Sequence, residues 1–529
     1  MFQQIRILSL SAVFALAACG SSSQTSSPAT STAHGTLSEN PPFRIASVDA
    51  ATLKAQLSAT TTGAALLQLA SDPQCGVDFY YLRFWTLGGA GETTESSGAL
   101  MVPTGSGATC SGPRPIVLYA HGTNTDKTLN LADITKASNT EGVLIAAMFA
   151  AQGYIVVAPN YAGYDISTLG YHPFLNAVQQ SGEMMDILAA ARTALPNTMS
   201  SAASDSGKLF VTGYSEGGHV AMATQRAMIA SHMTVTGAAP MSGPYALEAF
   251  GDAIFFGQVN LGSTEFSPLL TTSFQKAYGN VYNTPGDLYS ATYSSGIETL
   301  LPSATPLATL YTSGLLPQTA EFDSATPVVS VPGSQTLSAM LTAALQIPND
   351  PTNPDTPLFQ AGFGNPYLIN NSYRVAYAID AATDPDGAVP AATSTVGRAA
   401  AEPQQGLRQD FYINDLRSAW APDSPTLLCG GSGDPTVFFK VNTEVMAQFW
   451  KSLPTGVVTV LDVGATPAGP FAPIQAAFQA SEAQQVAYLE SAAGGGLSPA
   501  AAELDVTEGY HGAVAPFCTL AARTFFSQL

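Results

Sequence analysis

The feature that most constrains this chain is the pentapeptide Gly213-Tyr214-Ser215-Glu216-Gly217. It directly follows an apolar run over 208–211 and opens a long helical pattern over 216–230. A strand that turns sharply into a helix exposes the Ser215 hydroxyl at the turn, because the two glycines permit a backbone approach that a Cβ would block. Glycine is common here, at 47 of 529 residues, so the pentapeptide alone decides little and the surrounding sequence must agree.

Short apolar strands alternate with helices on both sides of Ser215. Such alternation predicts an α/β fold with a mostly parallel central sheet flanked by helices. Reactive groups in these sheets lie at the carboxyl ends of the strands, where the polar motifs of this chain occur. The expected strands are 77–87, 98–103, 115–119, 154–158, 208–211, 235–241, 425–429 and 457–463, and the expected helices are 143–152, 174–195 and 216–230.

The alternation stops between about 247 and 401, where apolar helical pieces such as 336–346 accompany a proline-rich connection at 348–354. We interpret 247–401 as a lid or cap inserted after the sixth strand, between the two parts of one α/β core at 46–246 and 402–529. A separate domain with no role over the site is the alternative. No repeat of fixed period is evident.

The N-terminus has the pattern of an export signal over 1–18, with a charged start and a short apolar stretch. Leu16-Ala17-Ala18-Cys19 resembles a bacterial lipobox, which predicts lipidation of Cys19, followed by a flexible tether over 19–45. The two residues after Cys19 are not Asp, so we expect an exported lipoprotein of the outer membrane or cell surface, held to the membrane by its lipid. An ordinary secretory cleavage site is the alternative.

The net charge, and the hydropathy of the chain after the expected signal, limit the possible partners. The chain has 18 basic and 38 acidic residues, a net charge of −20, which argues against nucleic acid and polyanionic surfaces. No segment after the signal offers the roughly 20 uncharged apolar residues that a membrane span requires. The sequence does not indicate the oligomeric state.

Two further motifs supply the base and the acid that a nucleophilic Ser215 needs. A serine hydroxyl needs a base to remove its proton, and the imidazole base needs a carboxylate to orient it. Asp434 follows the strand at 425–429, and His511 follows 77 residues after Asp434, which meets the order Ser, acid, His. Asp505 is the main rival for the acid, and Asp423 and Asp462 are weaker ones.

The remaining histidines receive other roles. His121 is assigned to the loop that would stabilise an oxyanion, and His219 on the helix after Ser215 is assigned to packing or support. His172 and His34 are expected at the surface or in loops. No cluster of converging metal ligands is evident, so we expect neither a metal nor a cofactor.

Four cysteines remain if Cys19 carries lipid. An even number in an exported protein predicts two disulfides, for which three pairings are possible. We favour Cys75 with Cys110 and Cys429 with Cys518, because the second bond would join the segments that carry Asp434 and His511. Four free thiols are the alternative.

The motifs in order resemble those of the α/β-hydrolase superfamily. They are Tyr119-Ala120-His121-Gly122-Thr123, the Ser215 pentapeptide, Gly433-Asp434-Pro435 and Tyr510-His511-Gly512. Within the superfamily the chain is similar to the secretory lipases and esterases of bacteria and fungi, the lipase A type, which carry a lid after the sixth strand. It differs from them in a helical insertion over 471–497 and a turn over 466–470.

The resemblance also implies an oxyanion hole. One backbone N–H would come from Glu216, and the other from Thr123, because His121-Gly122-Thr123 resembles the oxyanion segment of lipases with a single glycine before the donor. A plain tight turn is the alternative for this segment.

Together these features predict a serine carboxylic-ester hydrolase, a lipase or esterase of class EC 3.1.1, acting through an acyl-serine intermediate on a small-molecule ester or lipid. The apolar pairs 255–256 and 315–316 in the lid favour an acyl chain or an aromatic acyl group. A serine peptidase or acyltransferase on the same fold, and a non-catalytic surface adhesin, remain alternatives.

Overall fold

A computed structural model describes residues 33–198, 202–386, 399–400, 402–491 and 496–529 of the chain. The expected signal, the lipidation site at Cys19 and the first part of the tether lie outside the described residues. Within the described part of the chain, no helix combines the length and the apolar character that crossing a bilayer requires.

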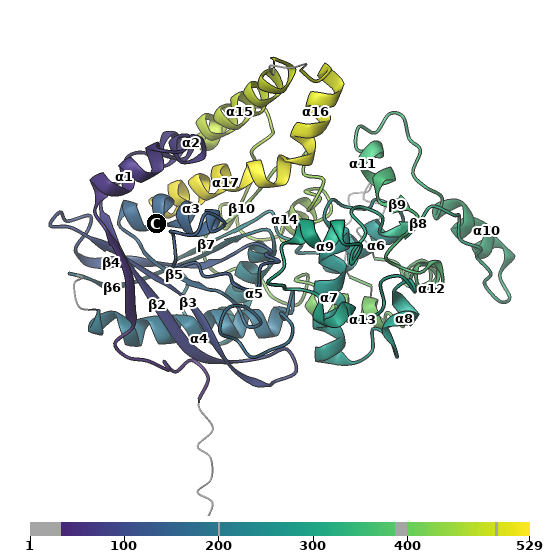
Figure 1. Cartoon of the computed structure of the whole chain (residues 1–529), viewed down its shortest axis with the longest axis horizontal. Helices are drawn as coiled ribbons and strands as arrows, with labels where there is room; N and C mark the ends of the chain where they lie inside the picture. Colours follow the sequence, from purple (N-terminus) through teal and green to yellow (C-terminus); the bar gives the residue numbers. More distant parts are fainter. Residues whose placement is uncertain (1–32, 199–201, 387–398, 401, 492–495) are drawn as a thin grey trace, which may run out of the picture. The chain divides into compact units, whose positions relative to one another are not determined.

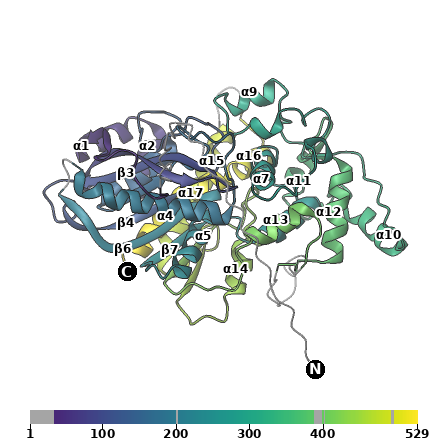
Figure 2. The same cartoon turned by 90° about the horizontal axis from the view of Figure 1, so that it is seen from below.

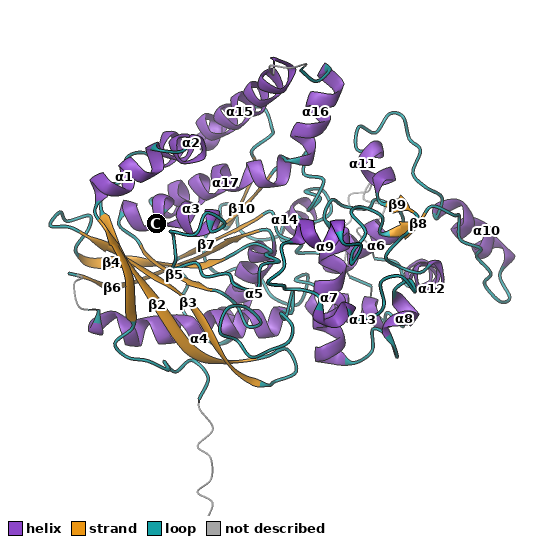
Figure 3. Ribbon diagram, in the orientation of Figure 1, coloured by secondary structure: helices purple, strands orange, loops and turns teal. Residues whose placement is uncertain are grey.

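Among the described residues, nine strands form one sheet in the order β1-β2-β3-β5-β4-β6-β7-β10-β11 (Figure 3). The pairs β1–β2, β2–β3 and β3–β5 are antiparallel, and every pair from β5 to β11 is parallel. The strands are β1 (Phe43–Val48), β2 (Gly76–Leu87), β3 (Thr93–Thr104), β4 (Gly112–Ala120), β5 (Ile155–Pro159), β6 (Ala203–Tyr214), β7 (Gly237–Met241), β10 (Thr426–Gly430) and β11 (Val458–Asp462).

This sheet confirms the predicted fold class. Each expected strand is present, and β7 is the sixth of them, although it is the seventh in the chain because β1 was not predicted. The sequence of β1, FRIASV, lacks a buried apolar face, and no residue of the strand is buried. It is held by pairing with β2 at the edge of the sheet, a tertiary contact that local sequence does not reveal.

Helices cover both faces of the sheet, as the nearly continuous apolar sequences of β4, β5 and β7 require. Helices α4 and α5 pack together on one face, and α2, α3 and α17 pack together on the other (Figure 1). The helices outside the insertion are α1 (Ala50–Ser58), α2 (Thr61–Ala70), α3 (Thr140–Met148), α4 (Ala177–Ala194), α5 (Glu216–Ala230), α14 (Thr443–Phe449), α15 (Ala472–Ser491), α16 (Pro499–Glu508) and α17 (Tyr510–Phe526), with 3-10 turns at Ala150–Gln152, Leu195–Asn197 and Gly469–Phe471.

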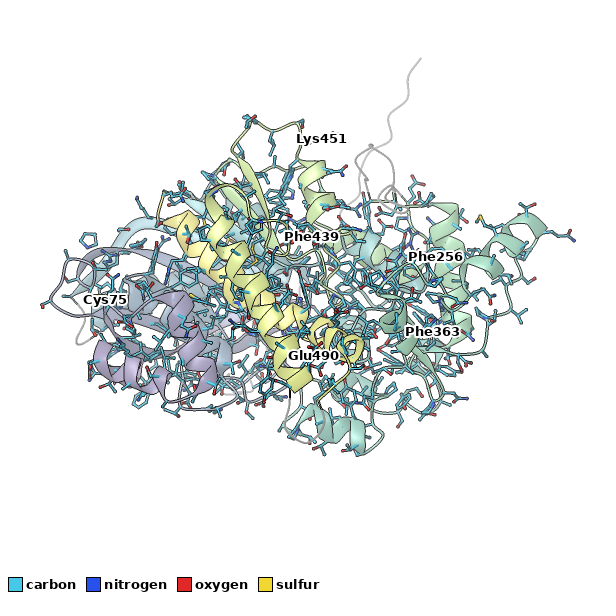
Figure 4. All side chains as sticks on the ribbon, turned by 90° about the horizontal axis from the view of Figure 1, so that it is seen from above. Cys75, Phe256, Phe363, Phe439, Lys451 and Glu490 are labelled. Atoms are coloured by element: carbon cyan, nitrogen blue, oxygen red, sulfur yellow. A yellow bond between two sulfur atoms is a disulfide. The ribbon has the colours of Figure 1, made fainter. Side chains whose placement is uncertain are left out.

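Between β7 and β10 the chain forms a group of mostly helical elements, which we name the insertion (242–425). A buried cluster, mostly of Phe, Tyr and Leu side chains, fills it and also takes in Phe174 and Leu175 from the segment before α4. Figure 2 shows its helices gathered beyond one end of the strands, and Figure 4 labels Phe256 and Phe363 within it. Its elements are α6 (Leu247–Phe255), α7 (Ser263–Tyr278), α8 (Pro285–Leu288), a 3-10 turn (Ile297–Thr299), α9 (Leu307–Thr312), β8 (Phe322–Asp323), α10 (Gln335–Ala344), α11 (Thr356–Ala361), β9 (Phe363–Gly364), α12 (Asn371–Thr383) and α13 (Gly406–Asn414).

A buried guanidinium joins three helices of the insertion. Arg408 of α13 is fully buried and pairs with Asp252 of α6 at 3.1 Å and with Asp380 of α12 at 2.9 Å. Its third partner is Glu248, also on α6, at 3.1 Å. Removing one partner of such a group leaves buried charge uncompensated, so this cluster fixes the relative positions of α6, α12 and α13.

Both favoured disulfides are present, and the predicted pairing is confirmed. Cys75 bonds to Cys110, and Cys429 at the end of β10 bonds to Cys518 in α17. The additional helical segment expected before His511 is a pair of helices, α15 and α16, that pack against each other. Their contact with α17 places them on the face of the sheet that α17 covers.

Candidate active site

Ser215 lies in a strained turn between β6 and α5. Its φ of 61° and ψ of −123° are unfavourable for a residue with a Cβ and persist only where the surroundings enforce them. The surroundings here are tight, because a Cβ on Gly217 would lie 2.0 Å from the carbonyl oxygen of Ala120. A Cβ on Gly213 would lie 2.5 Å from the same oxygen. The two glycines therefore let the turn pack against the end of β4.

The structure brings the three predicted side chains together. His511 Nε2 lies 2.8 Å from Ser215 Oγ, and His511 Nδ1 lies 2.6 Å from Asp434 Oδ2. The carboxylate accepts the Nδ1 proton, which leaves Nε2 free to accept the proton of the serine hydroxyl. Ser215 and Asp434 are buried, while the His511 side chain keeps 15% of its surface exposed.

Local contacts hold the acid and the base. Asp434 Oδ1 accepts hydrogen bonds from the backbone N–H groups of Thr436 and Val437 at 2.9 and 3.0 Å, so the loop after β10 fixes its carboxylate. His511 sits in the first turn of α17, and its carbonyl oxygen accepts the Tyr214 hydroxyl proton. Asp505, the main rival acid, is exposed on α16 and is not among the hydrogen-bond partners of His511.

The loop after β4 lies against the serine. A Cβ on Gly122 would lie 3.5 Å from Ser215 Cβ. The Gly122 N–H donates to Glu141 at 3.1 Å, and the Tyr119 hydroxyl donates to the same carboxylate at 2.7 Å. Burial raises the pKa of Glu141. This carboxylate at the start of α3 thus shapes the loop that presents Thr123.

Thr123 and Glu216 border the same pocket as Ser215. Within the described part of the chain, neither backbone N–H donates to a backbone carbonyl oxygen in the turns, loops and helix caps. Two free N–H groups beside a serine hydroxyl are the donors that a developing oxyanion requires. The arrangement can therefore support acyl transfer.

Two cavities meet at Ser215. The inner pocket, about 780 Å³ with its mouth included, runs into the insertion and is lined mainly by apolar side chains of α6, α7 and α13. The outer pocket, about 2490 Å³ with open space included, is bounded by residues of α2, α3, α15 and α17. His511 borders the outer pocket and not the inner one.

The two apolar pairs of the expected lid, 255–256 and 315–316, differ in whether they line the inner pocket. Phe255 lines the inner pocket, as expected for a residue that contacts an acyl group. Leu316 is buried within the insertion, and Leu315 is 49% exposed, so neither lines that pocket.

Solved structures that share this architecture show which proteins the chain resembles. The esterase LipA of Xanthomonas oryzae, described as degrading rice cell walls, is 25% identical with a TM-score of 0.60, covering 81% of this chain and 91% of its own. A Legionella pneumophila protein provisionally named a hydrolase is 17% identical with a TM-score of 0.59, covering 92% and 96%. The chain has the α/β-hydrolase fold.

Candida antarctica lipase A is a weaker match, 12% identical with a TM-score of 0.41, covering 81% of this chain and 76% of its own. No protein-family model and no curated protein matches the chain in sequence. By its similarity to the Xanthomonas oryzae protein, the chain resembles an esterase of the α/β-hydrolase fold. Among the described residues, no group of three or more His, Cys, Asp or Glu side chains could hold a metal ion.

His172 is a supporting residue whose burial was not predicted. It lies in a loop, which was one of the two expected places, but it is 1% exposed and its Nε2 lies 2.7 Å from Glu216 Oε1. Gln180 of α4 donates to the same oxygen at 2.6 Å. These contacts hold the residue that follows the serine. No local pattern marks His172, because its partner is 44 residues away in sequence.

His219, assigned to packing or support, and His121, assigned to the loop that would stabilise an oxyanion, are both buried. His219 is fully buried in α5, with Nε2 3.1 Å from the carbonyl oxygen of Asn414, and burial lowers its pKa to about 4. His121 is buried at the start of the loop after β4, with Nδ1 2.6 Å from the Gly122 carbonyl oxygen. The hydrogen bonds of these two imidazoles go to backbone carbonyl oxygens and not to the Ser215 or His511 side chain.

Proposed function

We propose that this protein is a serine carboxylic-ester hydrolase that acts through an acyl-serine intermediate. The observation that carries the proposal is the hydrogen-bonded series Ser215, His511 and Asp434 at the mouth of an apolar pocket. A serine made nucleophilic by an oriented imidazole, beside N–H donors, is suited to acyl transfer.

The chemistry follows from these positions. His511 Nε2 takes the proton as Ser215 Oγ attacks the ester carbonyl, and Asp434 stabilises the imidazolium that forms. The backbone N–H groups of Glu216 and Thr123 stabilise the negative oxygen. His511 then gives its proton to the leaving alcohol, and later takes one from the water that attacks the acyl-serine and releases the acid.

The two cavities divide the substrate. The leaving alcohol must lie within reach of His511, which borders the outer pocket, so the alcohol part occupies that side. The acyl part then extends into the narrow inner pocket, where most lining side chains are apolar. The outer pocket is wide enough for a bulky alcohol, which agrees with the description of the Xanthomonas oryzae esterase as acting on cell walls.

Labelling with a fluorophosphonate tests the proposal directly. We expect labelling of the native protein and none of Ser215→Ala. An adhesin on this fold stays unlabelled in both forms. A series of p-nitrophenyl esters from acetate to palmitate, measured beside an aminoacyl anilide, separates the classes of substrate. We expect turnover of esters and not of the anilide, and cleavage of the anilide at comparable kcat/KM would favour a peptidase.

We also propose export and lipid anchoring at Cys19. Two disulfides are common in oxidising compartments and rare in the cytosol, which supports export. Metabolic labelling with palmitate tests the anchor. We expect label in the native protein, which Cys19→Ala removes while releasing the protein from membranes. Unlabelled native protein would contradict lipidation.

A further inference from the structure

The inner pocket contains a buried carboxyl group that the proposed mechanism does not use. Glu321, just before β8, is 1% exposed and forms part of the pocket lining in the insertion. Its Oε1 accepts a hydrogen bond from the Ser267 hydroxyl of α7 at 2.5 Å. Its Oε2 has no hydrogen-bond partner among the described residues. An unpaired buried oxygen costs free energy, and one in a pocket wall is an acceptor that a bound molecule can satisfy.

The carboxyl group belongs to a polar strip along one side of the pocket. Ser263, Ser267 and Thr271 of α7 also line it, spaced four residues apart and therefore on one face of the helix. Phe266 and Leu270, between them in sequence, contribute apolar surface. A pocket meant only for hydrocarbon would not require this strip, because apolar side chains would fill the same positions without unpaired polar atoms.

Glu321 and Ser267 line the inner pocket alone, whereas Ser215 lines both pockets. The residues just before α7 contact the loop that carries Asp434, because the Asn260 side chain donates to the carbonyl oxygen of Thr436 at 2.9 Å. From Ser263, at the start of α7, to Ser267 the helix advances about 6 Å. Glu321 is therefore placed to meet a group part-way along an acyl chain and not the ester carbonyl.

Building on the function proposed above, we propose that Glu321 and Ser267 recognise a hydroxyl group on the acyl chain, so that the enzyme prefers esters of hydroxylated acids over esters of plain alkanoic acids. A hydroxyl group is both donor and acceptor, and it can pair with Oε2 whether the carboxyl is protonated or ionised. Burial raises the pKa of Glu321 to about 8, with the Ser267 hydroxyl opposing the shift, so a neutral carboxyl is available near neutral pH. An anionic group on the chain would meet a buried acid with no basic side chain beside it in the pocket lining.

The native enzyme tests this inference without any variant. Steady-state kcat/KM is measured for p-nitrophenyl esters of ω-hydroxy acids and of plain acids of equal length, from butanoate to dodecanoate. At the length that brings the hydroxyl to Glu321, we expect the hydroxylated ester to be hydrolysed about tenfold more efficiently. Equal or lower efficiency at every length would overturn the inference and would indicate that water alone pairs with Oε2.

Variants then attribute the preference to this side chain. Glu321→Met should abolish the advantage of the hydroxylated ester over the plain ester of equal length, measured as the ratio of their kcat/KM values. Glu321→Gln should keep most of it, because an amide can also pair with a hydroxyl. Asp410→Asn is the matched control, since Asp410 is another buried carboxyl of the insertion that does not line the pocket. An advantage that survives Glu321→Met would refute the assignment.

Failure of this inference is distinct from failure of the proposed function. If plain esters are hydrolysed in a Ser215-dependent manner but the hydroxyl brings no gain, only the role of Glu321 is wrong. If neither kind of ester is hydrolysed and Ser215 resists the fluorophosphonate, the proposed function itself is wrong.

Discussion

The disulfide between Cys429 and Cys518 joins the strand that precedes the acid to the helix that carries the base. Replacing both cysteines by alanine removes a bond that closes a loop of 89 residues. In the chain-entropy model this loop corresponds to about 4.6 kcal/mol of stability at 25 °C. Cys75 and Cys110, which close 35 residues, provide a matched double variant with an expected loss of about 3.8 kcal/mol.

The two double variants should differ more in catalysis than in stability. Asp434 lies in the loop that follows Cys429, and His511 lies two turns of α17 before Cys518. Without the Cys429–Cys518 disulfide, Asp434 Oδ2 and His511 Nδ1 can move apart from their distance of 2.6 Å. The other disulfide joins neither of the segments that carry these residues. We therefore expect kcat/KM to fall clearly only in the Cys429/Cys518 variant, at a temperature where both variants are folded.

Urea unfolding followed by circular dichroism measures the stabilities, and a p-nitrophenyl ester assay measures kcat/KM. A midpoint in the Cys429/Cys518 variant equal to that of the native protein would refute the entropic reasoning. Equal kcat/KM values for both double variants would refute the proposed mechanical link between the disulfide and the active site.

Three further changes test other parts of the structure. Asp434→Asn should lower kcat about 10⁴-fold while Asp505→Asn leaves it unchanged, and the reverse result in ester assays would make Asp505 the acid. Gly217→Ala should prevent folding of the active turn, because its Cβ would lie 2.0 Å from the Ala120 carbonyl oxygen. A soluble variant that still reacts with the fluorophosphonate would contradict that packing. The folded-state pKa of Glu321, about 8, lies above its ordinary value of 4.5, so the native protein keeps a proton that the unfolded chain releases and loses stability as pH rises between these values. Glu321→Gln should therefore gain stability relative to native protein across this range in urea titrations, and a constant difference would show that Glu321 titrates normally.

The alternation of strands and helices was readable from the sequence because buried parallel strands leave nearly continuous apolar runs. The β5 sequence Ile155–Pro159 is an example, and the second half of β4, its parallel neighbour, follows the same rule. The edge strand β1 was missed because its residues are largely exposed and its stability comes from pairing with β2. Apolar periodicity reports burial and not pairing.

The positions of the candidate site residues were predictable to a similar extent. Ser215 and His511 carry glycines beside them, and Asp434 follows a recognisable strand, so motif and order were informative. His172 and Glu321 carry no such mark. Each acquires its role from a partner on another element, Glu216 for the first and Ser267 for the second, and only the folded chain brings these pairs together.

The start of α7 is fastened to the turn that carries the acid, through the Asn260 side chain on Thr436 and the Leu261 N–H on the Pro435 carbonyl oxygen. A wide swing of the insertion would pull on that turn and disturb Asp434. Substrates should therefore arrive through the side of the molecule that His511 faces, threading the acyl end inward past the serine. The part of the insertion farthest from α7 can then vary in length without altering the catalytic geometry.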